Sequence, residues 1–200
     1  PDTTFGNNGQ VTILEDNPVI GDNPFLHDIE IQSNGRIVLV YHSSYSLYTN
    51  YGFRLLQPNG AILFGYTEVN WGYVGDMDEH FTQALIQPDD KILVGGYRDP
   101  LSGPSIGQDF LLERFESSTF SDDNFGVGGY AIADNNNQED RMYDLLLEPD
   151  GKILTCGSSQ AFSLMIAKFL DNGAPDLSFG TNGKIVYPNL LQTEFGSSIS

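Results

Sequence analysis

Basic residues, cysteine and long apolar runs are all scarce in this chain. It has 9 lysines and arginines against 27 aspartates and glutamates, which gives a formal net charge of −18 at pH 7. A surface so acidic repels phosphate groups, which disfavours nucleic acids and anionic membranes. The single cysteine, Cys156, excludes an internal disulfide. Because no run approaches the ~18 apolar residues of a membrane span, we expect neither nucleic-acid partners nor membrane insertion.

Stretches rich in helix-forming residues are equally few. Glycine accounts for 22 and proline for 10 of the 200 residues, and this frequency favours short elements joined by tight turns. Aromatic residues make up 12% of the chain, mostly phenylalanine and tyrosine, which fit the half-buried surface of a strand. Since 40% of the residues are hydrophobic, the chain can build a sizeable core. The composition therefore predicts an all-β fold.

A ten-residue phrase recurs along the chain. It is QPDDKILVGG at residues 87–96 and EPDGKILTCG at 148–157, and a looser copy, QSNGRIVLVY, occupies 32–41. The central Pro-Asp-Gly or Ser-Asn-Gly is typical of a tight turn, because proline presets φ while glycine or asparagine accepts the left-handed conformation. The apolar residues beside the turn predict a β-hairpin in each copy.

A second phrase has the same period. Its frame is Asp, two residues, Phe-Gly, two residues and Gly, and complete copies begin at Asp2, Asp122 and Asp176. A degenerate copy, AILFGYTE, keeps Phe64 and Gly65 but lacks the aspartate. The Phe-Gly pairs lie 54 to 61 residues apart, and the copies of the hairpin phrase are spaced in the same way. We expect the phenylalanine of each complete copy to be buried between repeats.

Each repeat divides into four short strands. One is an alternating run after the Phe-Gly turn, as at 10–14, two form the recurring hairpin, and the fourth leads to the next Phe-Gly turn. One four-stranded unit every ~40 to 60 residues is typical of a propeller blade. The prediction is a single β-propeller-like array of antiparallel blades over residues 1–200. Its predicted repeats cover 1–63, 64–124 and 125–178, and a further repeat starts in 179–200.

Three copies of the hairpin phrase predict about three blades. A closed propeller has about four to eight. We therefore expect the chain to be part of a longer propeller, in which each unit packs on its neighbours.

The phrases also resemble those of a known repeat family. LEPDGKIL, IQPDDKIL, LDNGAPDLSFGTNGKIV and DFLLERF are similar to the repeats of the bacterial delta-sixty family, and the resemblance covers nearly the whole chain. It implies propeller-like repeats in a protein that is secreted or displayed at the bacterial cell surface, beside further blades of the same protein. It implies no catalytic residues, so the expected function is non-catalytic binding or scaffolding with a protein or glycan partner.

The alternative is a glycan-active enzyme that uses an axial pocket of the propeller. Paired carboxylates hydrolyse glycosides, but none of the 27 acidic residues stands out as a pair. Cys156 takes the place of Gly95 in the aligned repeat, and no partner marks it as a nucleophile. The three histidines, His27, His42 and His80, are too scattered along the chain to indicate a metal site. We therefore expect no enzyme activity.

Two acidic loops contain the candidate metal ligands. GDMDEH holds Asp76, Asp78 and Glu79, and DNNNQED holds Asp134 and Asp140. Calcium takes about six to eight oxygen ligands from loops of this kind, so it is the candidate ion, although neither loop has the EF-hand pattern. The alternative is that acidic side chains cap turns through backbone amides, as we expect for the aspartates that recur before Phe-Gly. No other cofactor is expected.

The candidate ligand-binding residues are aromatic. YHSSYSLYTNY and NWGY place Tyr45, Tyr48, Trp71 and Tyr73 in irregular stretches near the start of the chain. Exposed rings stack on sugars or anchor protein partners. Recurring residues serve the folding of every repeat, whereas a binding site needs residues that one repeat has and the others lack. The alternative for these rings is packing at an edge or between blades.

Overall fold

The computed structural model describes the backbone of residues 1–13, 23–45, 48–69, 79–99, 107–117, 120–160 and 163–188. For residues 23–24, 43–45, 48–50 and 64–69 it describes the backbone alone. The regular secondary structure in these ranges consists of β-strands, without a helix, so the predicted all-β fold is confirmed.

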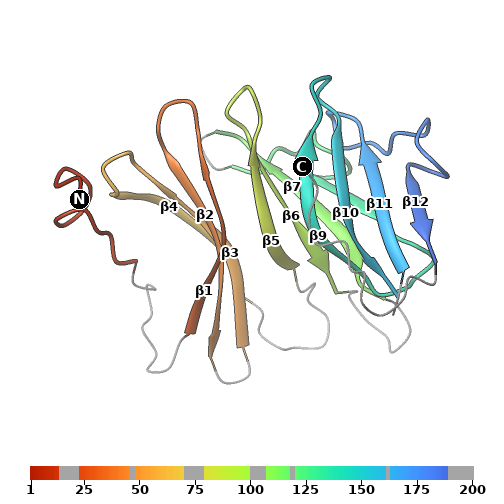
Figure 1. Ribbon diagram of the computed structural model, residues 1–200, viewed down its shortest axis with the longest axis horizontal. Coiled ribbons are helices and arrows are strands. Elements are labelled where there is room, and N and C mark those ends of the chain that lie inside the picture. The colour runs from red at the N-terminus through yellow and green to blue at the C-terminus, as the bar shows by residue number, and fades with distance from the viewer. Residues whose placement is uncertain are drawn as a thin grey trace.

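The described strands form three antiparallel sheets of four, which Figure 1 shows side by side along the long axis of the molecule. The first sheet contains β1 (Asn23–Ile31), β2 (Ile37–Tyr45), β3 (Tyr48–Leu56) and β4 (Ile62–Val69). The second contains β5 (Glu79–Ile86), β6 (Ile92–Arg98), β7 (Asp109–Phe115) and β8 (Tyr130–Ala133). The third contains β9 (Asp140–Leu147), β10 (Ile153–Ser159), β11 (Ser163–Phe169) and β12 (Lys184–Tyr187). The strands of each sheet follow chain order, so the prediction of three four-stranded units is confirmed.

Two hydrophobic clusters fill the spaces between neighbouring sheets. The cluster between the first and second sheets includes Val38, Val40, Phe53, Phe81, Ile92, Val94 and Leu111. The cluster between the second and third sheets includes Leu93, Phe110, Leu112, Phe125, Met142, Ile153 and Met165. Successive side chains of β6 thus enter different clusters, because successive residues of a strand point to opposite faces. The continuous apolar run of the hairpin phrase therefore marks a strand that is buried on both faces.

Each copy of the ten-residue phrase forms a hairpin, as predicted. The turns join β1 to β2, β5 to β6 and β9 to β10. Gly151 has a φ of 86°, and Asp90 at the equivalent position has a φ of 65°, a conformation that only glycine adopts without strain. The carboxylate of Asp90 also accepts hydrogen bonds from the Ser33 amide at 2.7 Å and the Ser33 hydroxyl at 2.5 Å. These bonds tie the second hairpin to the first.

The first strand of every sheet also carries a β-bulge at the same place. The bulged residue is His27 in β1, Thr82 in β5 and Tyr143 in β9. A bulge increases the local twist and redirects side chains near the end of a strand. The three sheets therefore share one backbone plan that the sequence phrases do not reveal.

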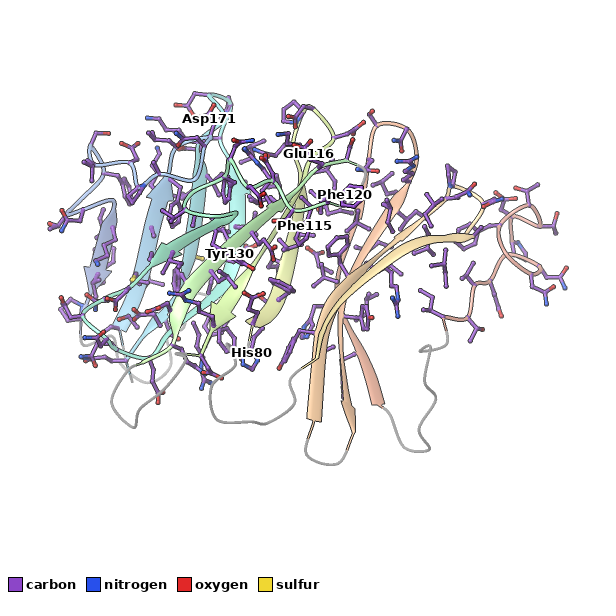
Figure 2. All side chains as sticks on the ribbon, turned by 180° about the vertical axis from the view of Figure 1, so that it is seen from behind. His80, Phe115, Glu116, Phe120, Tyr130 and Asp171 are labelled. Carbon is purple, nitrogen blue, oxygen red and sulfur yellow. The ribbon has the colours of Figure 1, made fainter. Side chains whose placement is uncertain are left out.

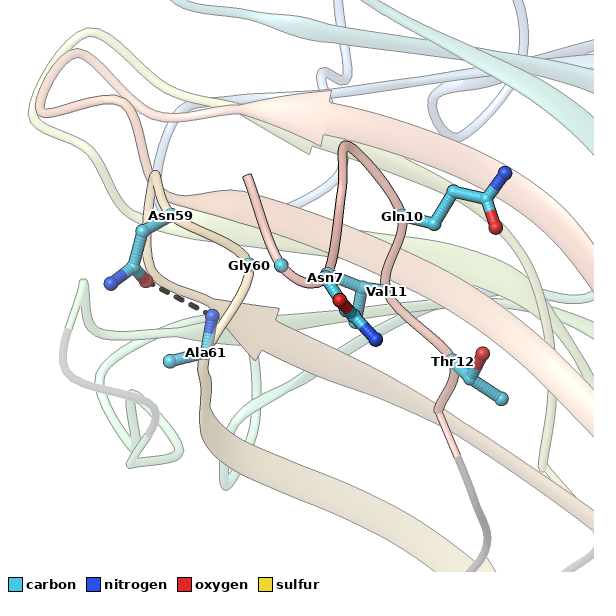
Figure 3. A pocket seen from close by; sticks show the side chains of 8 residues that line it. Asn7, Gln10, Val11, Thr12, Asn59, Gly60 and Ala61 are labelled. Atoms are coloured by element: carbon cyan, nitrogen blue, oxygen red, sulfur yellow. Dashed lines mark hydrogen bonds between the residues drawn. The ribbon is translucent and has the colours of Figure 1, made fainter. Parts of the chain in front are cut away.

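The Phe-Gly turn docks one sheet onto the next. Phe125 is fully buried in the cluster between the second and third sheets. The Gly126 amide beside it donates a hydrogen bond of 2.7 Å to the carbonyl of Asn172, in the turn between β11 and β12. The same contact joins Gly6 to the Asn59 carbonyl at 2.8 Å, beside the hollow that Figure 3 shows between the N-terminal turn and the β3–β4 turn.

Other expectations about the Phe-Gly phrase are wrong. Phe5 and Phe179 are only partly buried, because among the described residues neither has a sheet on both sides, as Phe125 does. Residues 10–13 form no strand, since the described part of the chain offers no sheet edge beside them for pairing. Phe64 and Gly65 do not form a turn but pair with Leu55 and Arg54 as part of β4.

The boundaries between sheets differ from the boundaries between sequence repeats that were counted from one Phe-Gly pair to the next. They divide the chain between β4 and β5 and between β8 and β9. The turn that contains Phe125 precedes β8, the last strand of the second sheet. Each sheet therefore begins with the first strand of the recurring hairpin.

Candidate functional site

The recurring residues and the candidate functional residues lie at opposite ends of the sheets. Because strands alternate in direction, the hairpins between first and second strands share one end with the connections between third and fourth strands. We call this the hairpin end, and the opposite end, where the chain passes from sheet to sheet, the linker end. Figure 2 shows Glu116 and Asp171 at the hairpin end and His80 at the linker end.

A row of aromatic and histidine rings crosses the linker end of the first sheet. The His42 ring of β2 stacks on the Phe25 ring of β1, with the ring centroids 5.0 Å apart. On the neighbouring strand β3, the Tyr51 ring lies 5.3 Å from the His42 ring. Nε2 of His27, the bulged residue of β1, lies 2.6 Å from Nδ1 of His42. Burial lowers the pKa of both histidines, and the proximity of His42 to His27 lowers that of His27 further. Both rings are therefore largely neutral at pH 7.

The row continues into the second sheet. The His80 ring meets the edge of Tyr51 at 4.4 Å and stacks on Tyr97 at 4.4 Å. Arg141 of the third sheet places its guanidinium 5.4 Å from the centre of the Tyr97 ring. We call Phe25, His27, His42, Tyr51, His80 and Tyr97 the ring row. The three histidines are far apart in the sequence, but pairing of β1 with β2 and packing of the first sheet on the second bring them into this row.

Polar side chains line the same part of the linker end. His80 Nε2 lies 3.1 Å from Oδ2 of Asp99, and this contact is the main reason why the pKa of Asp99 is below its ordinary value. The Gln108 amide donates a hydrogen bond of 2.5 Å to the other Asp99 oxygen. The Arg141 guanidinium in turn donates to the carbonyl oxygen of the Gln108 side chain. Rings and hydrogen-bonding groups therefore lie together on one surface.

A group of three carboxylates lies close by on the second and third sheets. Asp109 begins β7, Asp134 follows β8 and Asp140 begins β9. One oxygen from each lies within 4.8 Å of the others. Burial raises the pKa of Asp140 to about 6, against hydrogen bonds from Ser159 and the Asn135 amide, and the nearby Asp134 and Asp109 raise it further. Burial likewise raises the pKa of Asp109.

The sequence-predicted metal ligands are thus separated. Asp134 and Asp140 come together, and Asp109 joins them although the sequence interpretation missed it. Phe110 of β7 pairs with Ala133 of β8. Asp109, just before Phe110, and Asp134, just after Ala133, therefore lie side by side at the linker ends of these two strands. Glu79 is buried at the start of β5 and is not part of this group. Asp76 and Asp78 lie outside the described residues.

The four aromatic residues predicted to bind a ligand lie mostly outside the part of the chain whose side chains the structure describes. Trp71 and Tyr73 lie outside it, and Tyr45 and Tyr48 are described by their backbone alone. Tyr45 and Tyr48 are paired at the linker ends of β2 and β3, three residues along those strands from His42 and Tyr51 respectively. They therefore extend the strands that carry the ring row. The pairing of β2 with β3 is the signal that could have located the row.

Other features of the described residues offer less. Cys156 is buried in β10, where burial raises the pKa of its thiol to about 11, so it is a poor nucleophile at neutral pH. No apolar helix of membrane-spanning length occurs in the described part of the chain. The hollow in Figure 3 is lined by the Phe-Gly turn and the β3–β4 turn, including Asn7, Gln10 and Asn59. The side-chain oxygen of Asn59, Oδ1, accepts a hydrogen bond of 3.0 Å from the Ala61 amide.

Comparison with known proteins adds nothing to these observations. No family model matches this chain, and no curated protein matches it significantly. The function must therefore be inferred from the site and not from the fold.

Proposed function

We propose that this chain is a non-catalytic binding and scaffolding module in a propeller-like array, and that it is secreted or displayed at a bacterial surface. The observation that supports this best is the separation of residues between the two ends of the sheets. The residues that recur lie at the hairpin end, where they form turns and join sheets. The ring row lies at the linker end of the first and second sheets, and the third sheet has Arg141 at the position equivalent to Phe25 and His80.

The chemistry of the ring row favours a glycan as the partner. Phe25 is 57% exposed and His27 is also exposed, so both present ring surface to solvent. Ring faces stack on the apolar faces of sugars, while nearby polar groups bind sugar hydroxyls. Asp99, Gln108 and Arg141 provide such groups at the second and third sheets. A protein partner is the alternative outcome.

Binding by two exposed ring variants tests this surface. Glycan-array binding by the intact chain would be compared with Phe25→Ala and His27→Ala, which remove side chains that no core cluster contains. Each should weaken binding about tenfold, as truncation of a contact ring does. The control is Phe120→Ala, an exposed phenylalanine outside the ring row. Unchanged binding by both folded ring variants would place the site elsewhere, and binding to an immobilised protein instead of glycans would overturn the glycan assignment.

The array part of the proposal rests on an exposed face of the first sheet. Leu26 is 59% exposed, whereas its equivalents Phe81 and Met142 are fully buried against the preceding sheet. The equivalence follows from strand pairing, because these residues pair with Tyr41, Gly96 and Gly157, which share one place in the hairpin phrase. The first sheet thus exposes the face that the other two sheets bury.

A second position gives the same result. Ile29 is 54% exposed, whereas its equivalents Ala84 and Leu145 are buried. The turn at residues 2–9 hydrogen-bonds to the β3–β4 turn of the first sheet, and the turn that contains Phe125 makes the equivalent hydrogen bond to the β11–β12 turn of the third sheet. In the third sheet that contact comes from the preceding unit. We therefore infer that a further four-stranded unit of the same protein packs against the face of β1 that carries Leu26 and Ile29.

Charge substitution distinguishes a covered face from a free one. Leu26→Lys should cost under ~0.5 kcal/mol in this 200-residue segment, as surface changes do. In the full-length natural protein it should cost about 2 kcal/mol or more, because an unpaired charge would then be buried. Val127→Lys, at an 88% exposed position, is the control and should be neutral in both proteins. Equal small losses for Leu26→Lys in both would refute the covering unit.

A further inference from the structure

The link between the second and third sheets brings three carboxylates to one point. Asp109 is the first residue of β7 in the second sheet, and Asp134 directly follows β8, the last strand of that sheet. Asp140 is the first residue of the third sheet. Their closest oxygens lie within 4.8 Å of one another. The connecting loop is fixed by the chain itself, because the Asn135 amide donates to Asp140 Oδ2 at 2.6 Å and the Asn137 amide donates to Asp134 Oδ1 at 2.7 Å.

Asp140 is the residue that turn formation does not explain. Its side chain is 0% exposed, yet its Oδ1 atom has no hydrogen-bond partner among the described residues. A buried carboxylate oxygen without a partner is costly, and native proteins rarely leave one unsatisfied. The Asn135 amide donates to Oδ2 and Ser159 also hydrogen-bonds to the carboxylate, yet Oδ1 is left without a partner in the described ranges. The remaining oxygen is available to a bound cation.

Positive side chains in the described part of the chain contact two members of this group but leave Asp140 Oδ1 without a partner. Arg98 donates hydrogen bonds of 3.4 Å from Nε and Nη2 to Asp109 Oδ2, and Lys184 donates its ammonium to the backbone carbonyl of Asp134. Neither cation reaches Oδ1 of Asp140 within hydrogen-bond distance. Negative charge at the centre of the group is therefore only partly compensated.

We propose that Asp109, Asp134 and Asp140 bind one calcium ion at the junction of the second and third sheets. Carboxylate oxygens from loops and strand ends are the ligands that calcium takes, and its flexible coordination allows water to complete the shell. Magnesium demands near-ideal octahedral geometry and dehydrates reluctantly, so it suits this loop-borne group less well. The ion would join β7, β8 and β9 and hold the two sheets together. This site is independent of the proposed ligand surface at the ring row.

Calorimetric titration tests the site directly. The 200-residue chain, freed of metal by a chelator, would be titrated with CaCl₂ and separately with MgCl₂ at constant ionic strength. One saturable calcium site is expected, together with a calcium-dependent rise in the unfolding temperature. Asp140→Asn and Asp134→Asn should each weaken calcium binding at least tenfold and reduce the calcium-dependent rise. Asp140→Asn retains an oxygen that can accept the Asn135 amide, and Asp134→Asn changes a less buried residue, so both variants should fold.

Asp123→Asn is the matched control, because it removes one exposed carboxylate at the hairpin end of the second sheet. It should bind calcium as the wild type does, although the net charge changes by the same amount. The absence of a saturable site, or equal calcium binding by Asp140→Asn, Asp134→Asn and Asp123→Asn, would overturn the proposal. Magnesium binding as tight as calcium binding would overturn the assignment to calcium.

Discussion

The ammonium of Lys91 lies 2.7 Å from Oδ2 of Asp122, so an ion pair joins the hairpin phrase to the Phe-Gly phrase within one sheet. The third sheet repeats this contact between Lys152 and Asp176 at 3.0 Å. Asp122 is almost fully buried and also accepts a hydrogen bond of 2.9 Å from Arg114. The two phrases recur together because their residues form one contact in each of these sheets.

Removal of this carboxylate should destabilise the second sheet. Asp122→Ala leaves Lys91 and Arg114 without their buried partner, so we expect a loss of about 3 kcal/mol in the free energy of unfolding. Urea denaturation measures the loss. Asp123→Ala, one residue away and exposed, should change stability by less than ~0.5 kcal/mol. Similar losses in the two variants would show that the ion pair is not the cause.

Stability should fall in acid through these same aspartates. Burial acts to raise the pKa of Asp122, but hydrogen bonds from Lys91, the Asn124 amide and Arg114 outweigh it and lower the pKa to about 2. Hydrogen bonds from Ser178 and Lys152 lower the pKa of Asp176 to about 2. An aspartate in the unfolded chain has an ordinary pKa of 3.8, so between that pH and about 2 the unfolded chain binds more protons than the native state.

It follows that the stabilisation from both groups is present above the unfolded pKa and is lost as the pH falls through the folded pKa. The stability difference between wild type and Asp122→Asn should therefore shrink as the pH falls from about 5 to about 2. Urea titrations at several pH values measure this difference. A difference that is constant across the range would contradict the lowered pKa.

Burial of the recurring phenylalanine should matter most between two sheets. Phe125 is fully buried, so Phe125→Ala should cost about 3–5 kcal/mol. Phe179 is partly exposed, and Phe179→Ala should cost about half as much or less, because less area leaves water on folding. Thermal or urea unfolding compares the two variants. Equal losses would mean that the Phe-Gly turn contributes through its own conformation and not through docking.

Two glycines with the same backbone conformation should differ in tolerance to alanine. Gly151 and Gly173 have φ values of 86° and 82°, so alanine strains both backbones by about 1 kcal/mol. A methyl group at Gly151 finds its nearest neighbour at 3.7 Å, whereas at Gly173 it would lie 2.7 Å from the Gly126 nitrogen and 2.9 Å from the Phe125 ring. Gly173→Ala should therefore be about 2 kcal/mol less stable than Gly151→Ala. Similar stabilities would argue against close docking of the Phe-Gly turn.

Local signals in the sequence predicted much of this fold. The hairpins at 32–36, 87–91 and 148–152 were predicted from turn residues alone, because proline, asparagine and glycine act through their own backbone preferences. The strand predicted to lead to the next Phe-Gly turn is β7 in the second sheet, Asp109–Phe115. The run at 10–13 was predicted as a strand and forms none, since a strand requires a partner that local pattern does not reveal.

The sequence by itself determined the repeated unit, its four strands and its acidic surface, because turn preference, alternation and charge are properties of neighbouring residues. Only the tertiary structure brought His27, His42 and His80 into one row and Asp109 beside Asp134 and Asp140. These contacts depend on strand register, on the shared bulge and on how one sheet packs against the next. Those features arise from side-chain packing between residues far apart in the chain, so no local pattern encodes them.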